Sequence, residues 1–251
     1  MRIWFFDFDG ALSPIVSDRN AAVLDSACAH MLNELSKSPT DWVAIISSRT
    51  LEDILSRVPL DDVIIGGNCG MEWQLPGGCR LSPGSDYKDI LQFRRETLIP
   101  LIKKFGSNPE IEIEVKKWSV AIHLKQPGHQ STKQVVKAIT MWAEREKITL
   151  HHSPNVIEIQ LIPGFNKSVG ASFIANKLNI NTQKDTIIYS GGDVNDAVAM
   201  WWALMTGGTA IMVGSLLKVF GAIYVKNQQE LVDAVKLLKK QLGHDKSDIR
   251  D

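Results

Sequence analysis

Two carboxylates, Asp7 and Asp9, follow a short apolar run at residues 3–6, and Gly10 comes directly after them. If the run is a strand of an open α/β sheet, both carboxylates point into the crevice beyond its carboxyl end, where such sheets bind ligands. Two neighbouring carboxylates can take different roles in one reaction: one acts as the nucleophile, and the other donates and accepts a proton. Gly10 lets the backbone turn tightly beside an anion. An Asx-type turn after a strand is the simpler alternative.

Hydroxyl and cationic groups appear where two further elements begin. Ser47 and Arg49 follow the apolar run 42–46 and could bind a phosphoryl group, although Ser-Ser-Arg is also an ordinary helix start. Lys167 opens a predicted helix, and an anion is favoured at a helix N-terminus. A lone lysine at such a place is more often a solvated surface charge.

The segment Gly-Gly-Asp-Val-Asn-Asp at residues 191–196 follows another apolar run, at residues 186–189. Its carboxylates, Asp193 and Asp196, are ligands of the kind that Mg²⁺ prefers. The alternative is a flexible loop in which Asp193 or Asn195 caps the helix that follows.

The elements that must position these residues alternate along both ends of the chain. Near-continuous apolar strands between helices are typical of a parallel sheet covered on both faces, so we expect an α/β, Rossmann-like core. The apolar spacing predicts strands at 3–6, 42–46, 63–65, 186–189, 210–213 and 222–225, and helices at 21–35, 51–58, 167–178, 195–205 and 230–242.

The middle of the chain has a different pattern. Residues 111–125 alternate polar and apolar side chains, which is typical of half-exposed antiparallel strands. Helices are predicted at 89–104 and 133–145, and further strands at 149–151 and 156–161. We therefore expect a smaller inserted α+β domain at residues 85–161, within a core formed by residues 1–84 and 162–251.

Bulk composition narrows the class of protein. The 251 residues include 28 basic and 28 acidic side chains, a balance that gives no reason to expect binding to nucleic acid or to a membrane surface. The three cysteines show no metal-ligand spacing and form no disulfide framework, and the first residues show no export signal. A cytoplasmic monomer is expected.

An uncharged stretch at residues 197–217 is nominally long enough to cross a bilayer. Thr-Gly-Gly-Thr at residues 206–209 interrupts it, and we expect a helix, a turn and a buried strand there instead.

Taken in order, Asp-x-Asp-Gly, Ser47, Lys167 and Gly-Gly-Asp-x-x-Asp resemble the four motifs of the haloacid-dehalogenase-like phosphatases, over nearly the whole chain. The resemblance implies covalent phosphoryl transfer. Asp7 attacks phosphorus, Asp9 protonates the leaving oxygen and then activates water, and Ser47 and Lys167 bind the phosphoryl group. It also implies a Mg²⁺ ion held by Asp7, by the backbone carbonyl of Asp9 and by an acidic residue of the 191–196 loop.

The inserted segment is similar to trehalose-6-phosphate phosphatases in particular. Residues 114–125 resemble the Glu-x-Lys and His-aromatic-Arg cap pattern of that family, residues 156–167 its approach to the lysine motif, and residues 67–70 its Gly-Asn-x-Gly segment. The similarity implies trehalose 6-phosphate as the substrate. The expected substrate contacts are Arg49, Asn68, Glu114, Lys116, His123, Lys125 and Glu158. On the pattern alone, alternating Glu and Lys on a strand pair is usually a solvated face.

The sequence also departs from that family. Cys69 stands where histidine is usual, Lys125 where arginine is usual, and Ser48 where glycine is usual. At the metal loop, Gly192 occupies the usual ligand position. We therefore expect Asp193 to replace it as a ligand, with Asp196 supporting Lys167 or a metal-bound water. Two alternatives stay open: another glycosyl phosphate of the sucrose or glycosylglycerate type as substrate, or an impaired protein that binds a sugar phosphate and regulates.

Overall fold

A computed structural model describes residues 1–244 except residues 17, 127, 149, 154 and 215–217. The chain divides into two compact units. Unit 1 comprises Met1–Leu81 together with the chain from Asn166 onward, and unit 2 comprises Ser82–Phe165. The expected α/β core with a smaller α+β insert is confirmed.

Unit 1 is built on an eight-stranded sheet in the order β12-β11-β10-β1-β2-β3-β4-β5. The six strands from β12 to β3 are parallel, and β4 and β5 add an antiparallel edge that the sequence analysis did not predict. Its strands are β1 (Arg2–Phe6), β2 (Asp41–Ile46), β3 (Ile64–Gly67), β4 (Glu72–Gln74), β5 (Arg80–Leu81), β10 (Thr186–Gly191), β11 (Thr209–Val213) and β12 (Ile223–Val225). Its helices are α1 (Ser26–Ser36), α2 (Leu51–Arg57), α5 (Lys167–Lys177), α6 (Val194–Met205) and α7 (Gln228–His244).

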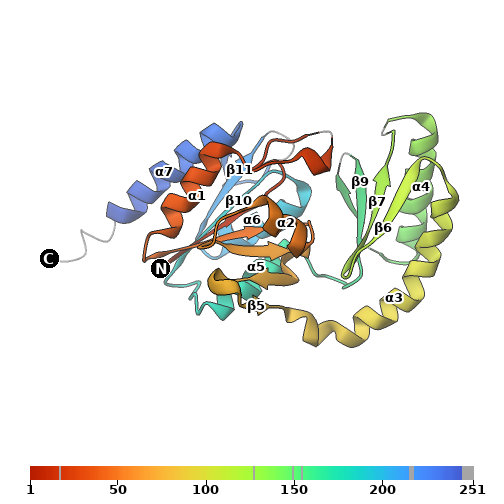
Figure 1. The fold of residues 1–251 in the computed structure, drawn as a ribbon, viewed down its shortest axis with the longest axis horizontal. Helices are drawn as coiled ribbons and strands as arrows, with labels where there is room; N and C mark the ends of the chain where they lie inside the picture. Colours follow the sequence, from red (N-terminus) through yellow and green to blue (C-terminus); the bar gives the residue numbers. More distant parts are fainter. Residues whose placement is uncertain (17, 127, 149, 154, 215–217, 245–251) are drawn as a thin grey trace. The chain divides into compact units, whose positions relative to one another are not determined.

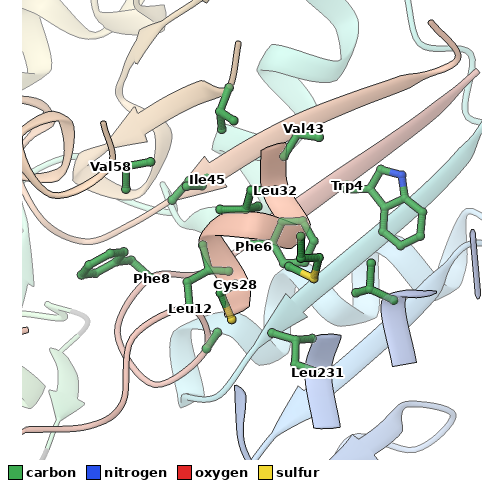
Figure 2. Packing of buried hydrophobic residues seen from close by; sticks show 14 of the residues in the cluster. Trp4, Phe6, Phe8, Leu12, Cys28, Leu32, Val43, Ile45, Val58 and Leu231 are labelled. Carbon is green, nitrogen blue, oxygen red and sulfur yellow. The ribbon is translucent and has the colours of Figure 1, made fainter. Parts of the chain in front are cut away.

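Alternation along the central strand β1 divides the core into two layers. Trp4 and Phe6 pack with buried residues of α1, α2 and α7 on one face (Figure 2), whereas Ile3 and Phe5 pack with those of α5 and α6 on the other. Helices α1 and α7 lie side by side on the first face (Figure 1). Because both faces are covered, the strands are apolar throughout, as in other parallel sheets.

Helix α1 begins five residues after the position predicted for it. Asp25 is its N-cap and accepts hydrogen bonds from the backbone N–H groups of Ala27 and Cys28. The preceding residues Arg19–Ala21 form a short 3₁₀ turn instead. Capping by an aspartate side chain therefore fixes this helix start more strongly than the apolar spacing that continues upstream of it.

Unit 2 is a four-stranded antiparallel sheet in the order β6-β7-β9-β8, and two helices cover one of its faces (Figure 1). Its elements are α3 (Lys88–Lys103), β6 (Ile111–Val115), β7 (Ser119–Leu124), α4 (Gln130–Arg145), β8 (Leu150–Ser153) and β9 (Val156–Gln160). Alternate residues of β7 and β9, such as Ile122 and Ile157, pack with the helices, which leaves the intervening polar residues on the opposite face.

The boundaries of unit 2 lie a few residues outside the expected 85 and 161. Gly84 lies against the ring of Trp118, and the ring of Tyr87 meets that of Phe165 edge to face at 5.8 Å. Leu161 is also part of the core of unit 2. Aromatic packing therefore extends the unit a few residues beyond both expected boundaries.

The uncharged stretch near residue 200 folds as expected into α6, a turn with Gly207 at φ 77°, and the strand β11. Within the part of the chain that the structure describes, no helix has both the length and the apolar character needed to cross a membrane.

A close backbone approach sets the position of α5. A Cβ atom added at Gly170 would lie 2.2 Å from the carbonyl oxygen of Cys69 and 2.8 Å from the Cα atom of Gly70. No real side chain tolerates such a contact, so α5 can pack against the 68–70 turn only with glycine at this position. The start of α5, which carries Lys167, is thereby fixed relative to the end of β3.

We therefore expect Gly170→Ala to lower the melting temperature, although alanine in a helix interior is otherwise favoured over glycine by about 1 kcal/mol. Asn176→Ala, at an exposed position of the same helix, is the matched control and should leave the melting temperature unchanged or slightly raised. Thermal unfolding of both variants checks this, and a stabilised Gly170→Ala protein would contradict the close approach.

Candidate active site

Asp7 lies at the carboxyl end of the central strand of unit 1. Its backbone N–H donates to the carbonyl oxygen of Ser190 at 2.8 Å, which continues the pairing of β1 with β10 for one residue. The residue is 2% exposed. Its Oδ1 atom accepts a hydrogen bond from Lys167, whereas its buried Oδ2 atom has no hydrogen-bond partner among the residues that the structure describes.

Lys167 is the first residue of α5 and links two carboxylates. Its Nζ atom lies 2.7 Å from Oδ1 of Asp7 and 2.7 Å from Oδ1 of Asp196, and only 1% of its side chain is exposed. A cation at a helix N-terminus opposes the helix dipole, so the two carboxylates must stabilise it there. Burial alone would lower the pKa of Lys167, but the charges of Asp196 and Asp7 hold that pKa well above its ordinary value. Lys167 is therefore a fixed ammonium group.

Asp196 uses both carboxylate oxygens within the protein. Its Oδ1 atom accepts from Lys167 and from the hydroxyl of Tyr189, and its Oδ2 atom accepts from the backbone N–H groups of Gly192 and Asp193. Burial acts to raise the pKa of Asp196, yet Lys167 and these hydrogen bonds lower it below its ordinary value. Four bonds occupy the acceptor positions of a carboxylate, so Asp196 positions Lys167 and the loop and does not have a free oxygen for a cation.

Asp193 is the N-cap of α6. Its Oδ1 atom accepts from the backbone N–H of Asp196, and the two residues form a reciprocal capping box. The expected alternative for this residue, helix capping, is thus correct. Burial, followed by the charge of Asp196, raises the pKa of Asp193 to about 6. Carboxylate oxygens of Asp7, Asp193 and Asp196 lie within 4.8 Å of one another.

The glycines before Asp193 leave no room for a side chain. A Cβ atom at Gly192 would lie 2.9 Å from the carbonyl oxygen of Val213, and one at Gly191 would lie 2.3 Å from Cγ of Asp196. A carboxylate at position 192 would require the backbone to shift. Asp193 is therefore the member of this loop whose carboxylate can reach a cation beside Asp7 while Asp196 stays bound to Lys167.

A divalent cation fits the residues of this cluster. Burial and the charge of Asp196 raise the pKa of Asp7 well above its ordinary value, although Lys167 acts in the opposite direction. A buried carboxylate oxygen without a partner is costly, and a cation bound at Oδ2 would remove that cost. Asp7 and Asp193 supply the oxygen ligands that hard cations such as Mg²⁺ prefer.

Asp9 lies apart from this cluster and pairs with Arg49. Nε and Nη2 of Arg49 donate to the two carboxylate oxygens of Asp9 at 2.8 and 2.7 Å. From the sequence, Arg49 is expected to contact the substrate. In the structure its side chain is only 1% exposed and also binds Asp53 and the carbonyl oxygen of Arg19. Acceptors within the protein therefore occupy the guanidinium.

Ser47 and Asn68 follow β2 and β3 and are both buried. The Oγ atom of Ser47 accepts from the backbone N–H of Arg49 at 3.1 Å, and its hydroxyl hydrogen is not used in that bond. Nδ2 of Asn68 donates to Glu72, whereas its buried Oδ1 atom has no hydrogen-bond partner within the described part of the chain. Asn68 has a φ of 51°, a left-handed conformation that asparagine tolerates better than most residues.

Four of the five residues expected to contact the sugar in unit 2 form two pairs. Nε2 of His123 lies 2.9 Å from Oε2 of Glu114. Nζ of Lys116 lies 3.1 Å from Oε1 of Glu158, and both of these side chains are largely buried. The fifth, Lys125, is exposed at the other end of β7 from the hairpin turn that carries Lys116.

Three residues of these networks were not expected from the sequence. Tyr189 was part of an apolar run, and nothing in that run indicated that its hydroxyl donates to Asp196. Ser119 donates to Glu158 at 2.7 Å, and Nη1 of Arg95 donates to the carbonyl oxygens of Lys116 and Lys117. Ser119 lies in the segment at residues 111–125 whose side chains alternate between polar and apolar, which was the one available signal.

The raised pKa of Asp193 predicts a pH-dependent stability in metal-free protein. Because the folded-state pKa lies above the ordinary aspartate value of 3.8, the folded state binds more protons between about pH 4 and pH 6. This residue therefore destabilises the protein as the pH rises through that range. Asp193→Asn keeps a good N-cap without the charge. Relative to wild type, we expect the variant to gain roughly 1–3 kcal/mol of unfolding free energy from pH 4 to pH 7.

Chemical denaturation without divalent ions at several pH values measures that difference. A constant difference between the two proteins would contradict the buried, charged environment of Asp193. Asp62→Asn, at an exposed position of the same unit, is the control and should show no such trend.

Comparison with known proteins identifies the family of the chain. The sequence pattern of the family described as Trehalose-phosphatase matches residues 5–213. The chain is 27% identical over 210 residues to a trehalose-phosphate phosphatase of Mycobacterium marinum, covering 83% of this chain and 53% of that protein. It is 27% identical over 232 residues to a probable trehalose-phosphate phosphatase 4 of Oryza sativa subsp. japonica, covering 88% and 61%.

Among solved structures, the C-terminal domain of the C. albicans trehalose-6-phosphate phosphatase shares the fold, with a TM-score of 0.72 at 19% identity over 94% of this chain and 92% of that one. The chain spans between half and two thirds of the length of these two curated relatives. The family pattern covers most of the chain, including both carboxylates of the first motif, Lys167 and Asp196. The resemblance to haloacid-dehalogenase-like phosphatases is thus confirmed, and the chain belongs to the trehalose-phosphatase family.

Proposed function

We propose that this chain is a phosphatase that hydrolyses trehalose 6-phosphate, with Asp7 as its nucleophile. The observation that carries the proposal is the environment of Asp7, whose Oδ1 atom is held by Lys167 while its Oδ2 atom has no partner. A fixed orientation favours attack along one line, and the neighbouring ammonium stabilises charge that develops on the transferred group.

The reaction proceeds in two half-reactions. A carboxylate oxygen of Asp7 forms a bond to phosphorus while the bond from phosphorus to the sugar oxygen breaks, and Asp9 donates a proton to that departing oxygen. The carboxylate of Asp9 then takes a proton from water, whose oxygen attacks phosphorus and releases Asp7. Lys167 neutralises charge on the phosphoryl oxygens in both steps, and the hydroxyl of Ser47 donates to one of them.

A magnesium ion belongs to the proposal. Asp7 and Asp193 would hold it, together with the backbone carbonyl of Asp9. When bound, it would supply positive charge next to the phosphoryl oxygens. Asp196 would not be a ligand, because Lys167, Tyr189 and two backbone N–H groups occupy its oxygens.

The substrate proposal rests on the family and on the polar face of unit 2. Relatives that cover most of this chain are named trehalose-phosphate phosphatases. We propose that Glu114, Lys116, His123, Lys125 and Glu158 contact the sugar hydroxyls. Support comes from the two pairs that four of them form, His123 with Glu114 and Lys116 with Glu158. Glu158 and Lys116 are also buried, so little side-chain entropy remains to be lost on binding.

Asp7→Asn tests the nucleophile. The amide has nearly the same shape as the carboxylate but is a poor nucleophile, so we expect phosphate release from trehalose 6-phosphate, with magnesium present, to fall at least about 1000-fold. Melting temperature and circular dichroism establish that the variant folds, and Asp62→Asn is the activity control. Substantial residual turnover by Asp7→Asn would contradict the assignment, and failure of the wild-type protein with any sugar phosphate would contradict the function.

Glu158→Gln tests the sugar contacts separately from the chemistry. Loss of a charged, hydrogen-bonded contact should raise KM for trehalose 6-phosphate about tenfold, because such a bond contributes about 1.5–3 kcal/mol. Hydrolysis of p-nitrophenyl phosphate, which lacks the sugar, should change less than about twofold. Glu112→Gln, at an exposed position of β6, is the matched control. An equal loss with both substrates would point to damage of the fold instead.

A further inference from the structure

We propose that Arg49 is a positioning residue that fixes the orientation of the Asp9 carboxyl group for the second half-reaction, the hydrolysis of the phosphorylated Asp7. The inference rests on the proposed function, because it assigns a role within that reaction. It replaces the expectation that Arg49 contacts the substrate.

The guanidinium of Arg49 joins three segments of unit 1. Nε and Nη2 bind both carboxylate oxygens of Asp9, Nη1 binds Oδ2 of Asp53 at 2.8 Å, and Nη2 also donates to the carbonyl oxygen of Arg19 at 2.8 Å. Its Cζ atom lies 5.6 Å from the centre of the Phe8 ring. Four hydrogen bonds and this aromatic contact give the planar group a single orientation.

The exposed fractions of the side chains indicate that Arg49 is held in place, whereas the carboxylate of Asp9 is freer to move. The side chain of Arg49 is 1% exposed, whereas the carboxylates of Asp9 and Asp53 are 41% and 33% exposed. Asp53 also binds Arg57, which in turn donates to the carbonyl oxygen of Ala22. Arg49 is thus anchored on the side away from Asp9, and it presents two N–H groups that set the orientation of that carboxylate.

This orientation suits the acceptance of a proton. Because both oxygens of Asp9 already accept from Arg49, a proton on the same edge of the carboxyl group would displace one of those bonds. The remaining lone pairs point away from Arg49 and stay available. In the second half-reaction Asp9 takes a proton from water, the water oxygen bonds to phosphorus, and the bond from phosphorus to Asp7 breaks. The protonated Asp9 can then leave Arg49 and serve as the donor in the next turnover.

Arg49→Lys and Arg49→Met test this role. Lysine keeps the charge but cannot bind two carboxylate oxygens, Asp53 and a carbonyl at once. If water attack slows, kcat for trehalose 6-phosphate should fall at least about tenfold, within the usual contribution of general base catalysis. KM should fall in parallel, so that kcat/KM, which reports the first half-reaction, stays within about threefold of wild type. The acid-quenched protein should carry more bound phosphate at saturating substrate.

Arg57→Met is the matched control, because Arg57 also binds Asp53 and the loop carbonyls but does not touch Asp9. It should leave the fraction of phosphorylated protein unchanged. In an Asp9→Asn background, Arg49→Lys should cause little further loss, since the two residues act as one unit. If Arg49→Met does not fold, Asp53→Asn loosens Arg49 without touching Asp9 and should show a smaller effect in the same direction.

Two results would overturn the inference while the wild-type protein remains an active phosphatase: kcat/KM falling as much as kcat, or a fraction of phosphorylated protein that does not rise in either Arg49 variant. A full additional loss from Arg49→Lys in the Asp9→Asn background would also overturn it. If the wild-type protein released no phosphate from any ester, the proposed function would fail first, and this inference would fail with it.

Discussion

The buried ion cluster of Asp7, Lys167 and Asp196 is the constraint on which the rest of the site depends. Removing three charges from water costs several kcal/mol per ion, and only close contacts with good geometry offset that cost. Here both carboxylates lie 2.7 Å from the ammonium. Loss of Lys167 would leave two buried carboxylates without their cation, and an uncompensated buried charge typically costs about 3–5 kcal/mol. The cluster therefore links elements of unit 1 and is also the centre of the proposed chemistry.

Its three members come from elements that the fold brings to one edge of the sheet. Asp7 follows β1, Lys167 opens α5, and Asp196 lies in the first turn of α6. The close approach of Gly170 to the 68–70 turn fixes α5, and the absence of side chains at Gly191 and Gly192 lets the loop wrap around Asp196. In this arrangement one oxygen of Asp7 is bound by Lys167, and the other has no partner among the described residues. A carboxylate that served only in a salt bridge would not need a free oxygen, whereas a nucleophile does.

Much of the fold could be predicted from local pattern, because strands buried on both faces are apolar throughout and helices repeat every three to four residues. The two-residue strand β5 was missed because it is too short to show a period. At the site, the positions of Asp7 and Lys167 could be predicted from their places at the ends of elements. The partners of Arg49 could not, since Asp9 lies 40 residues away and an Arg–Asp pair leaves no local signal. Tyr189 was likewise indistinguishable from core until its hydroxyl was seen on Asp196.

The most direct test of the central claim is to locate the phosphoryl group during turnover. The protein, with magnesium, is mixed with trehalose 6-phosphate, quenched in acid and reduced with borohydride, which converts an aspartyl phosphate to homoserine. Peptide mass spectrometry then identifies the changed residue. The account predicts conversion at Asp7 and at no other carboxylate. Product formation with Asp7 unmodified, or modification at a different aspartate, would contradict it.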